Sequence, residues 1–161
     1  MEKYSCCFTG HREISCEKRE QIALQLNKLI CDLIHDGITY FYAGGARGFD
    51  TLAARAVMKA KEKHPHIKLI LILPCHSQAR FWMPDEISEY EYIKEKSDEV
   101  HYISTQYTKS CMLKRNRALV DASNVCVCYL ERESGGTAYT VRYAISKGLH
   151  IINMAKKQAS A

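Results

Sequence analysis

The 161-residue sequence contains no run of eighteen or more apolar residues, and the charged Glu2 and Lys3 have no long apolar stretch behind them. It therefore lacks the pattern of a membrane-spanning helix and of a secretion signal, and we expect a cytoplasmic protein with no membrane contact. No two of its eight cysteines are spaced Cys-x-x-Cys, and no metal-ligand spacing recurs among its cysteines and seven histidines. We expect buried thiols in a reducing compartment and no metal site.

Basic residues also form no long run, although 23 Lys and Arg against 18 Asp and Glu give a formal charge of +5. The nearest approaches to a run are Lys156-Lys157 and the set Lys59, Lys61 and Lys63. Both sets are more typical of solvated surfaces than of a nucleic-acid site. The net charge favours an anionic partner, and the scattered charge favours a small phosphorylated ligand over nucleic acid.

Six short apolar runs alternate with segments of helical periodicity. The runs cover 4–8, 38–43, 67–73, 100–103, 125–129 and 151–154, and the helical patterns cover 22–34, 52–60, 84–96, 112–122 and 137–147. Parallel strands need crossover helices, so this alternation predicts an α/β fold: a Rossmann-like, doubly wound, mostly parallel sheet of about six strands with helices on both faces. With 47% apolar residues, we expect a single domain over 1–161, with a core over about 4–154 and a short polar tail.

A glycine-rich loop follows the second apolar run. Its sequence is Ala-Gly-Gly-Ala-Arg-Gly-Phe-Asp over 43–50. Glycines let a ligand approach main-chain N–H groups, and the next helix presents its free N–H groups to an anion. The spacing matches neither the dinucleotide fingerprint nor a Walker loop, so the loop alone is a weak signal. We expect Asp50 to cap the helix, to tether the loop, or to contact a ribose hydroxyl.

Three further loops with polar residues also follow predicted strands: Thr9-Gly10-His11-Arg12, the connection 74–82, and Ser134-Gly135-Gly136-Thr137. Ligands of such folds bind at the carboxyl ends of the strands, so these loops should converge on one edge of the sheet. The loop 134–137 opens a helix and forms a second predicted anion cradle. Either glycine loop alone is equally consistent with a tight turn and a helix cap, and the pair is more informative.

Individual side chains have more than one interpretation. Arg12 suits a bidentate contact with phosphate or ribose. His11 is either a general acid or base or a hydrogen-bonding residue, and the second is favoured because no carboxylate is placed to orient it. Phe81 and Trp82 are favoured as hydrophobic plugs over base-stacking residues. The basic residues of the helix over 112–122 cannot share one face, so at most two point at a ligand.

Together these motifs, with Pro74, Gln78 and Trp82 and with Arg115-Asn116 followed by Val-Asp-Ala-Ser over 120–123, resemble the SLOG superfamily. This is the Rossmann-like group of the DNA-processing protein DprA and the cytokinin-activating LOG enzymes, and the small bacterial YpsA/YoqJ-type members are the most similar. The resemblance implies a nucleotide-derived ligand, and homodimers through outer helices are common in the group. The predicted ligand site comprises Thr9, Gly10, His11, Arg12, Gly44, Gly45, Ala46, Arg47, Gly48, Asp50, Pro74, Gln78, Trp82, Arg115, Asn116, Gly135, Gly136 and Thr137.

LOG enzymes hydrolyse the N-glycosidic bond of nucleoside monophosphates with an arginine and a glutamate from two motifs. Arg115 falls on the arginine and is the candidate catalytic residue that the resemblance implies. Ser134 and Ala138 replace a proline and a glycine of the second motif, and Arg142 stands where the glutamate belongs. A guanidinium cannot stabilise the positive charge that develops on the sugar, which weakens the hydrolase interpretation, although Asp50, Glu131 or Glu133 could substitute.

We therefore expect a sensor or regulatory domain that binds a nucleotide, an ADP-ribose-like molecule or a nucleoside monophosphate, with no certain cofactor. The first alternative is a LOG-like phosphoribohydrolase. The second is DprA-like binding of single-stranded DNA, which ranks last because the chain shows no stripe of aromatic and basic residues and has no room for the extra domains of DprA.

Overall fold

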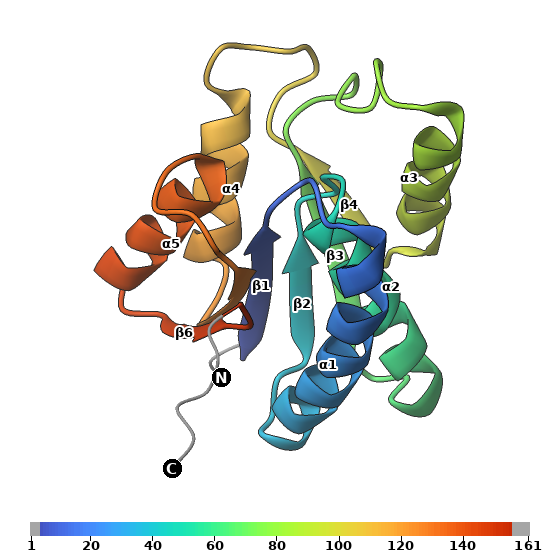
Figure 1. Ribbon diagram of the computed structural model, residues 1–161, viewed down its shortest axis with the longest axis vertical. Helices are drawn as coiled ribbons and strands as arrows, with labels where there is room; N and C mark the ends of the chain where they lie inside the picture. The colour runs from blue at the N-terminus through green and yellow to red at the C-terminus, as the bar shows by residue number, and fades with distance from the viewer. Residues whose placement is uncertain (1–3, 156–161) are drawn as a thin grey trace.

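The structure is a computed structural model that describes residues 4–155 (Figure 1), so Lys156-Lys157 lie outside the described residues. Six strands alternate with five helices in this range. In chain order the elements are β1 (Ser5–Gly10), α1 (Cys16–His35), β2 (Tyr40–Ala43), α2 (Phe49–Lys63), β3 (Lys68–Leu73), α3 (Pro84–Lys96), β4 (Glu99–Tyr102), α4 (Cys111–Asp121), β5 (Val125–Tyr129), α5 (Gly136–Ser146) and β6 (His150–Asn153).

All neighbouring strands are parallel, in the order β4-β3-β2-β1-β5-β6. The chain winds outward from β1 to β4 and then returns to the other side of β1 to form β5 and β6. Helices α1, α2 and α3 consequently cover one face, and α4 and α5 cover the other (Figure 1). The predicted Rossmann-like, doubly wound α/β fold is confirmed. The winding reverses between β1 and β5, which opens a crevice at their carboxyl ends.

The core has one part on each face of the sheet because successive side chains of a strand point to opposite faces. Phe8 packs with Phe41 and Phe49 on the side of α1 and α2, with ring centroids 6.1 Å and 6.5 Å apart. Cys7 lies on the opposite face with Cys126 and Cys128. All eight cysteines are free thiols and six are buried, as the sequence predicts for most of them.

Helix α2 begins two residues earlier than a cap at Asp50 would place it. Its N-cap is Gly48, whose φ of 74° lets the backbone turn directly beneath the loop after β1. Asp50 lies inside the first turn instead, so its predicted role as the cap is wrong. Its carboxylate accepts a hydrogen bond from the Ala46 N–H at 3.2 Å, which confirms the alternative role as a tether of the loop. Helix α5 likewise has a glycine, Gly135, at its N-cap.

Within residues 4–155, no helix is both long and apolar enough to cross a membrane. Across the same residues, no group of three or more His, Cys, Asp and Glu side chains is arranged to hold a metal ion.

Candidate functional site

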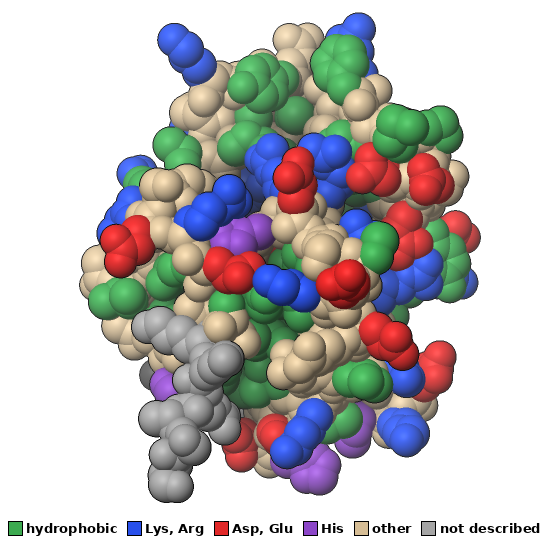
Figure 2. All heavy atoms as spheres, viewed as in Figure 1, with side chains coloured by type: hydrophobic (Ala, Val, Ile, Leu, Met, Phe, Trp, Pro, Cys, Tyr) green, Lys and Arg blue, Asp and Glu red, His purple; other side chains and the backbone are tan. Residues whose placement is uncertain are grey.

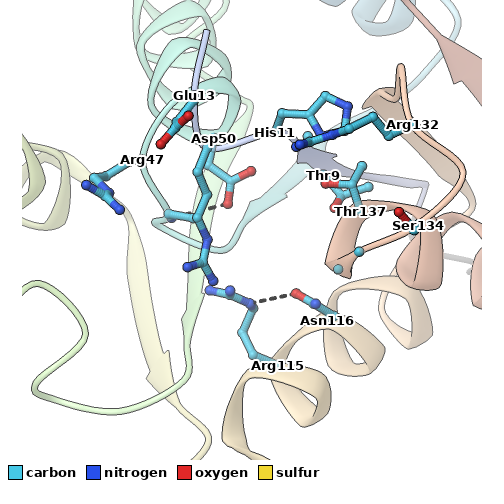
Figure 3. Close-up of a pocket in the computed structure, with 15 residues that line it drawn as sticks. Thr9, His11, Glu13, Arg47, Asp50, Arg115, Asn116, Arg132, Ser134 and Thr137 are labelled. Atoms are coloured by element: carbon cyan, nitrogen blue, oxygen red, sulfur yellow. Dashed lines mark hydrogen bonds between the residues drawn. The ribbon is translucent and has the colours of Figure 1, made fainter.

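A cleft of about 440 Å³ opens at the carboxyl ends of β1 and β5 (Figure 3). Its volume lies in the usual range for small-molecule sites. The loops after β1, β2 and β5 and the helix α4 each contribute to its walls, so the predicted convergence of loops on one edge of the sheet is confirmed for these segments. The lining residues are Thr9, Gly10, His11, Arg12, Glu13, Ala46, Arg47, Asp50, Arg115, Asn116, Arg132, Ser134, Gly135, Gly136 and Thr137.

The lining carries an excess of positive charge. Four arginines, from four different segments, face only two carboxylates, which belong to Glu13 and Asp50. Lys and Arg side chains gather across the upper middle of the face in Figure 2, where Figure 1 places the loops after β1 and β2. A concave site with this charge concentrates anions.

Arg115 is buried, with 4% of its surface exposed, and lies between α4 and the loop after β2. It donates hydrogen bonds to the Gly44 carbonyl, to Gln78 Oε1 at 3.2 Å and to Asn116 Oδ1 at 2.8 Å. Lys114 on the same helix is exposed, which agrees with the expectation that the basic residues of α4 do not share a face. Arg115 therefore joins two walls of the cleft while lining it.

Asp50 supplies a negative charge near Arg115 and is buried, with 5% of its surface exposed. Burial raises the pKa of its carboxyl to about 6, although Arg115 and the Ala46 N–H both act to lower it. Burial lowers the pKa of the Arg115 guanidinium, and Asp50 opposes that effect. The pair is thus a desolvated charge pair whose carboxylate titrates near neutral pH.

Arg47 reaches the cleft from the loop after β2, and its side chain points away from Asp50 in Figure 3. Its Nη1 lies 3.8 Å from Glu86 Oε1, and its guanidinium lies 5.6 Å from the centre of the Trp82 ring. Its Nε is buried and has no hydrogen-bond partner among residues 4–155. The other nitrogens of this guanidinium carry the charge that Arg47 brings to the lining of the cleft.

His11 makes the kind of hydrogen-bonding contact that the sequence analysis favoured for it. Its Nε2 accepts a hydrogen bond from the Glu131 N–H at 2.9 Å, so the imidazole joins the loop after β1 to the loop after β5. Burial lowers the pKa of the ring, and the nearby Arg132 guanidinium lowers it further, against the opposite effect of Glu131. In Figure 3, His11 and Arg132 lie side by side at the edge of the cleft.

The two glycine loops differ in what lies beside them. A Cβ added at Gly48 would lie 2.3 Å from the Arg12 carbonyl oxygen, and one at Gly44 would lie 2.8 Å from Arg115 Nη1. At Gly135 and Gly136, by contrast, an added Cβ meets no atom of the described residues within 4 Å. The first loop therefore uses its glycines for close packing, whereas the second leaves open space in front of the N-terminus of α5, where main-chain N–H groups suit an anion.

Six predicted site residues lie outside the lining of the cleft. They belong to the loop after β2 and to the connection after β3 that packs beside it: Gly44, Gly45, Gly48, Pro74, Gln78 and Trp82. Trp82 packs edge-on against Tyr90, with ring centroids 5.2 Å apart, as a partly buried plug. The same expectation is wrong for Phe81, which is 89% exposed because the connection after β3 turns it outward.

The lining also contains Glu13 and Arg132, which the sequence analysis did not select. Glu13 directly follows the 9–12 motif, and Arg132 comes shortly after β5. The rule that ligands bind where strands end would have included both residues if it had been applied to whole loops and not only to glycine motifs. Arg142 is exposed, lies outside the lining and donates to the Glu133 carbonyl at 3.2 Å.

Known proteins share both the sequence pattern and the fold. UPF0398 protein BH1768 of Halalkalibacterium halodurans is 32% identical over 138 residues, which cover 84% of this chain and 70% of that protein. The prophage-derived protein YoqJ of Bacillus subtilis is 29% identical over 116 residues, covering 65% of this chain and 68% of YoqJ.

Among solved structures, DNA processing protein A of Helicobacter pylori superposes with a TM-score of 0.67 at 17% identity, over 99% of this chain and 68% of its own. At that identity the likeness shows the fold alone. The YpsA family, described as the YspA SLOG family, matches residues 6–155. The chain therefore belongs to the YspA SLOG family, as its motifs suggested.

Proposed function

We propose that the cleft binds a small, phosphorylated, nucleotide-derived ligand and that the protein acts as a sensor or regulatory domain. The observation that carries this proposal is the lining: four arginines against two carboxylates, beside the open N-terminus of α5. Arginine guanidinium groups and helix N-termini are the groups that proteins commonly use to bind phosphate. The Arg47 guanidinium is one of these arginines and comes from the loop after β2.

Calorimetry with AMP, ADP-ribose and NAD⁺ tests the proposal. At least one of them should bind, and Arg47→Gln should weaken that binding because it removes a donor of the lining. Arg55→Gln is the matched control, since Arg55 pairs with Glu89 on the outer surface of α2 and α3, outside the cleft. Absence of binding by all three ligands would refute the proposal.

Binding without cleavage is the favoured form of this function. Position 142 supplies an exposed arginine and no carboxylate. Asp50 is buried and already accepts the Ala46 N–H, which leaves the exposed Glu13 as the other carboxylate of the lining. We expect chromatography to detect no free base after long incubation with AMP, GMP, CMP or UMP. Release of base that depends on Arg115 would instead establish the hydrolase alternative.

Binding of single-stranded DNA is a second candidate. The H. pylori structure is described as having a single-stranded DNA binding mode. On this chain, Phe81 is 89% exposed with the Arg80 guanidinium 5.2 Å from its ring centre, a combination on which a base can stack. If DNA binds, its affinity should fall steeply with salt, and Phe81→Ala should weaken it about fivefold or more, whereas Tyr4→Ala should not. Fluorescence anisotropy with a labelled oligothymidine measures both effects.

A further inference from the structure

The protein backbone fixes the protonation state of His11. The ring is 7% exposed, and its Nε2 receives the Glu131 N–H at 2.9 Å. A backbone N–H can only donate, so Nε2 carries no proton. The ring is therefore neutral, and its single proton must lie on Nδ1. This state agrees with the lowering of the His11 pKa by burial and by Arg132.

The Nδ1 atom of His11 faces a second donor. The Nη2 of Arg132 lies 3.4 Å away from it. A guanidinium can only donate, and the protonated Nδ1 of His11 is also a donor. The two nitrogens therefore cannot form a hydrogen bond with each other. The Nδ1–H of His11 and an N–H of the exposed Arg132 thus lie side by side at one corner of the cleft. A single oxygen placed about 2.9 Å from both nitrogens would accept a hydrogen bond from each.

We propose that His11 and Arg132 together bind one unprotonated oxygen of the ligand's phosphate group, His11 as a neutral donor and Arg132 as a charged one. This inference rests on the proposed function and names the side chains that recognise the phosphate. The residues Ser134, Gly135, Gly136 and Thr137 line the same cleft. Their hydroxyl and main-chain donors are suited to the other oxygens of the same phosphate.

The start of the loop that carries Arg132 is anchored by contacts within the protein. Asn153 accepts the Leu130 N–H and donates to the Leu130 carbonyl, both at 3.1 Å. The Glu131 N–H is held by His11, and the Glu131 carboxylate lies 3.4 Å from Lys18 Nζ. Arg132 therefore extends from fixed backbone, so less freedom is lost when it binds an oxygen.

Nitrogen NMR of the imidazole rings tests the protonation state directly, with AMP and inorganic phosphate as probes and adenosine as the control without phosphate. In the free protein, His11 should be neutral, with its proton on Nδ1. AMP and phosphate should shift Nδ1 much more than Nε2, because Nε2 stays bonded to Glu131, and adenosine should shift neither. A proton on Nε2 of the free protein, or a bound AMP that leaves Nδ1 unchanged, would overturn the inference.

Substitutions test whether the two side chains bind the same oxygen. Arg132→Gln and His11→Gln should each weaken AMP binding at least tenfold; glutamine at position 11 can still accept the Glu131 N–H. The double variant should lose much less than the product of the two single losses, because the second change removes a contact already broken. Fully multiplicative losses would contradict a shared oxygen. Arg142→Gln, an exposed arginine outside the lining, should stay within twofold of the wild type.

The outcomes separate this inference from the proposed function. If AMP or ADP-ribose binds and the changes at His11 and Arg132 have no effect, the proposed phosphate site at these two residues is refuted. The proposed function is then still supported. If no nucleotide binds, the proposed function falls, and inorganic phosphate decides the site by itself: a shift of Nδ1 supports it, and no shift at millimolar phosphate refutes it.

Discussion

Asp50 is a buried carboxyl group whose pKa depends on folding. Its pKa rises from 3.8 in the unfolded chain to about 6 in the fold. Between these values the folded state binds more protons than the unfolded state, so the contribution of Asp50 to stability falls as pH rises from about 4 to 6 and is constant above that window. The difference of about two pKa units corresponds to about 3 kcal/mol.

Asp50→Asn tests this effect by urea unfolding at several pH values. The free energy of unfolding of the wild type, relative to the variant, should decrease by about 2 kcal/mol between pH 4 and pH 7. His11 acts in the opposite direction, because its lowered pKa makes stability rise as pH approaches 6.5, but it is present in both proteins and cancels. Glu13→Gln, at an exposed carboxylate of the same cleft, is the control. A pH-independent difference would mean that Asp50 titrates normally.

Gly48 differs from an ordinary left-handed glycine through its neighbours. Gly48, at φ 74° and ψ −120°, and Gly148, at φ 80°, both have a positive φ that strains any other residue. An added Cβ at Gly48 would lie 2.3 Å from a backbone carbonyl oxygen, whereas at Gly148 it meets nothing within 4 Å in the part of the chain that the structure describes. Gly148→Ala should cost about 1–2 kcal/mol, and Gly48→Ala at least about 2 kcal/mol more, by thermal unfolding. Equal losses would show that the loop after β1 moves aside freely.

At the scale of elements, two asparagines connect strands to neighbouring segments, one at the carboxyl ends of the strands and one at their amino ends. Asn153 holds Leu130 at the carboxyl edge beside the cleft, whereas Asn124 accepts the Ser5 N–H at the amino edge. Asn153→Ala and Asn124→Ala should both lower the free energy of unfolding by about 1–3 kcal/mol, since each leaves a backbone group unpaired.

Only Asn153→Ala should also weaken binding of AMP, because only this change releases the loop that carries Arg132. Calorimetry on both variants, below their unfolding temperatures, makes the comparison. Equal affinities in the two variants would show that the Asn153 contact supports the fold and not the cleft.

The elements themselves were largely predictable from the sequence, because apolar runs such as 67–73 and helical repeats such as 22–34 depend on local periodicity. The roles of the loop residues were less predictable. Gly48 and Gly136 both occur in glycine motifs before helices, yet one packs beneath a carbonyl and the other faces open space. That difference is set by chain segments far away in sequence, as is the burial of Arg115 while its neighbour Lys114 is exposed.

At the scale of the whole molecule, β1 is the strand on which both halves of the fold depend. It pairs with β2 on one side and with β5 on the other, whereas β4 and β6 form the edges of the sheet. Amides of β1 that bond to a neighbouring strand should therefore exchange with solvent only through global unfolding, and those of β4 through smaller openings. Native-state hydrogen exchange at increasing denaturant tests this order. Equal dependence on denaturant in β1 and β4 would contradict it.

The pairing of β1 with β5 also affects how the protein is made. The Glu131 N–H and the His11 ring that it contacts are separated by 120 positions in the chain. During synthesis, the loop after β1 leaves the ribosome long before the loop after β5 is made. Until then, the side of β1 that pairs with β5 has no partner strand, and the buried thiols of β1 are exposed. The nascent chain is therefore open to mispairing until β5 emerges, and ligand binding can assist only the last step of folding.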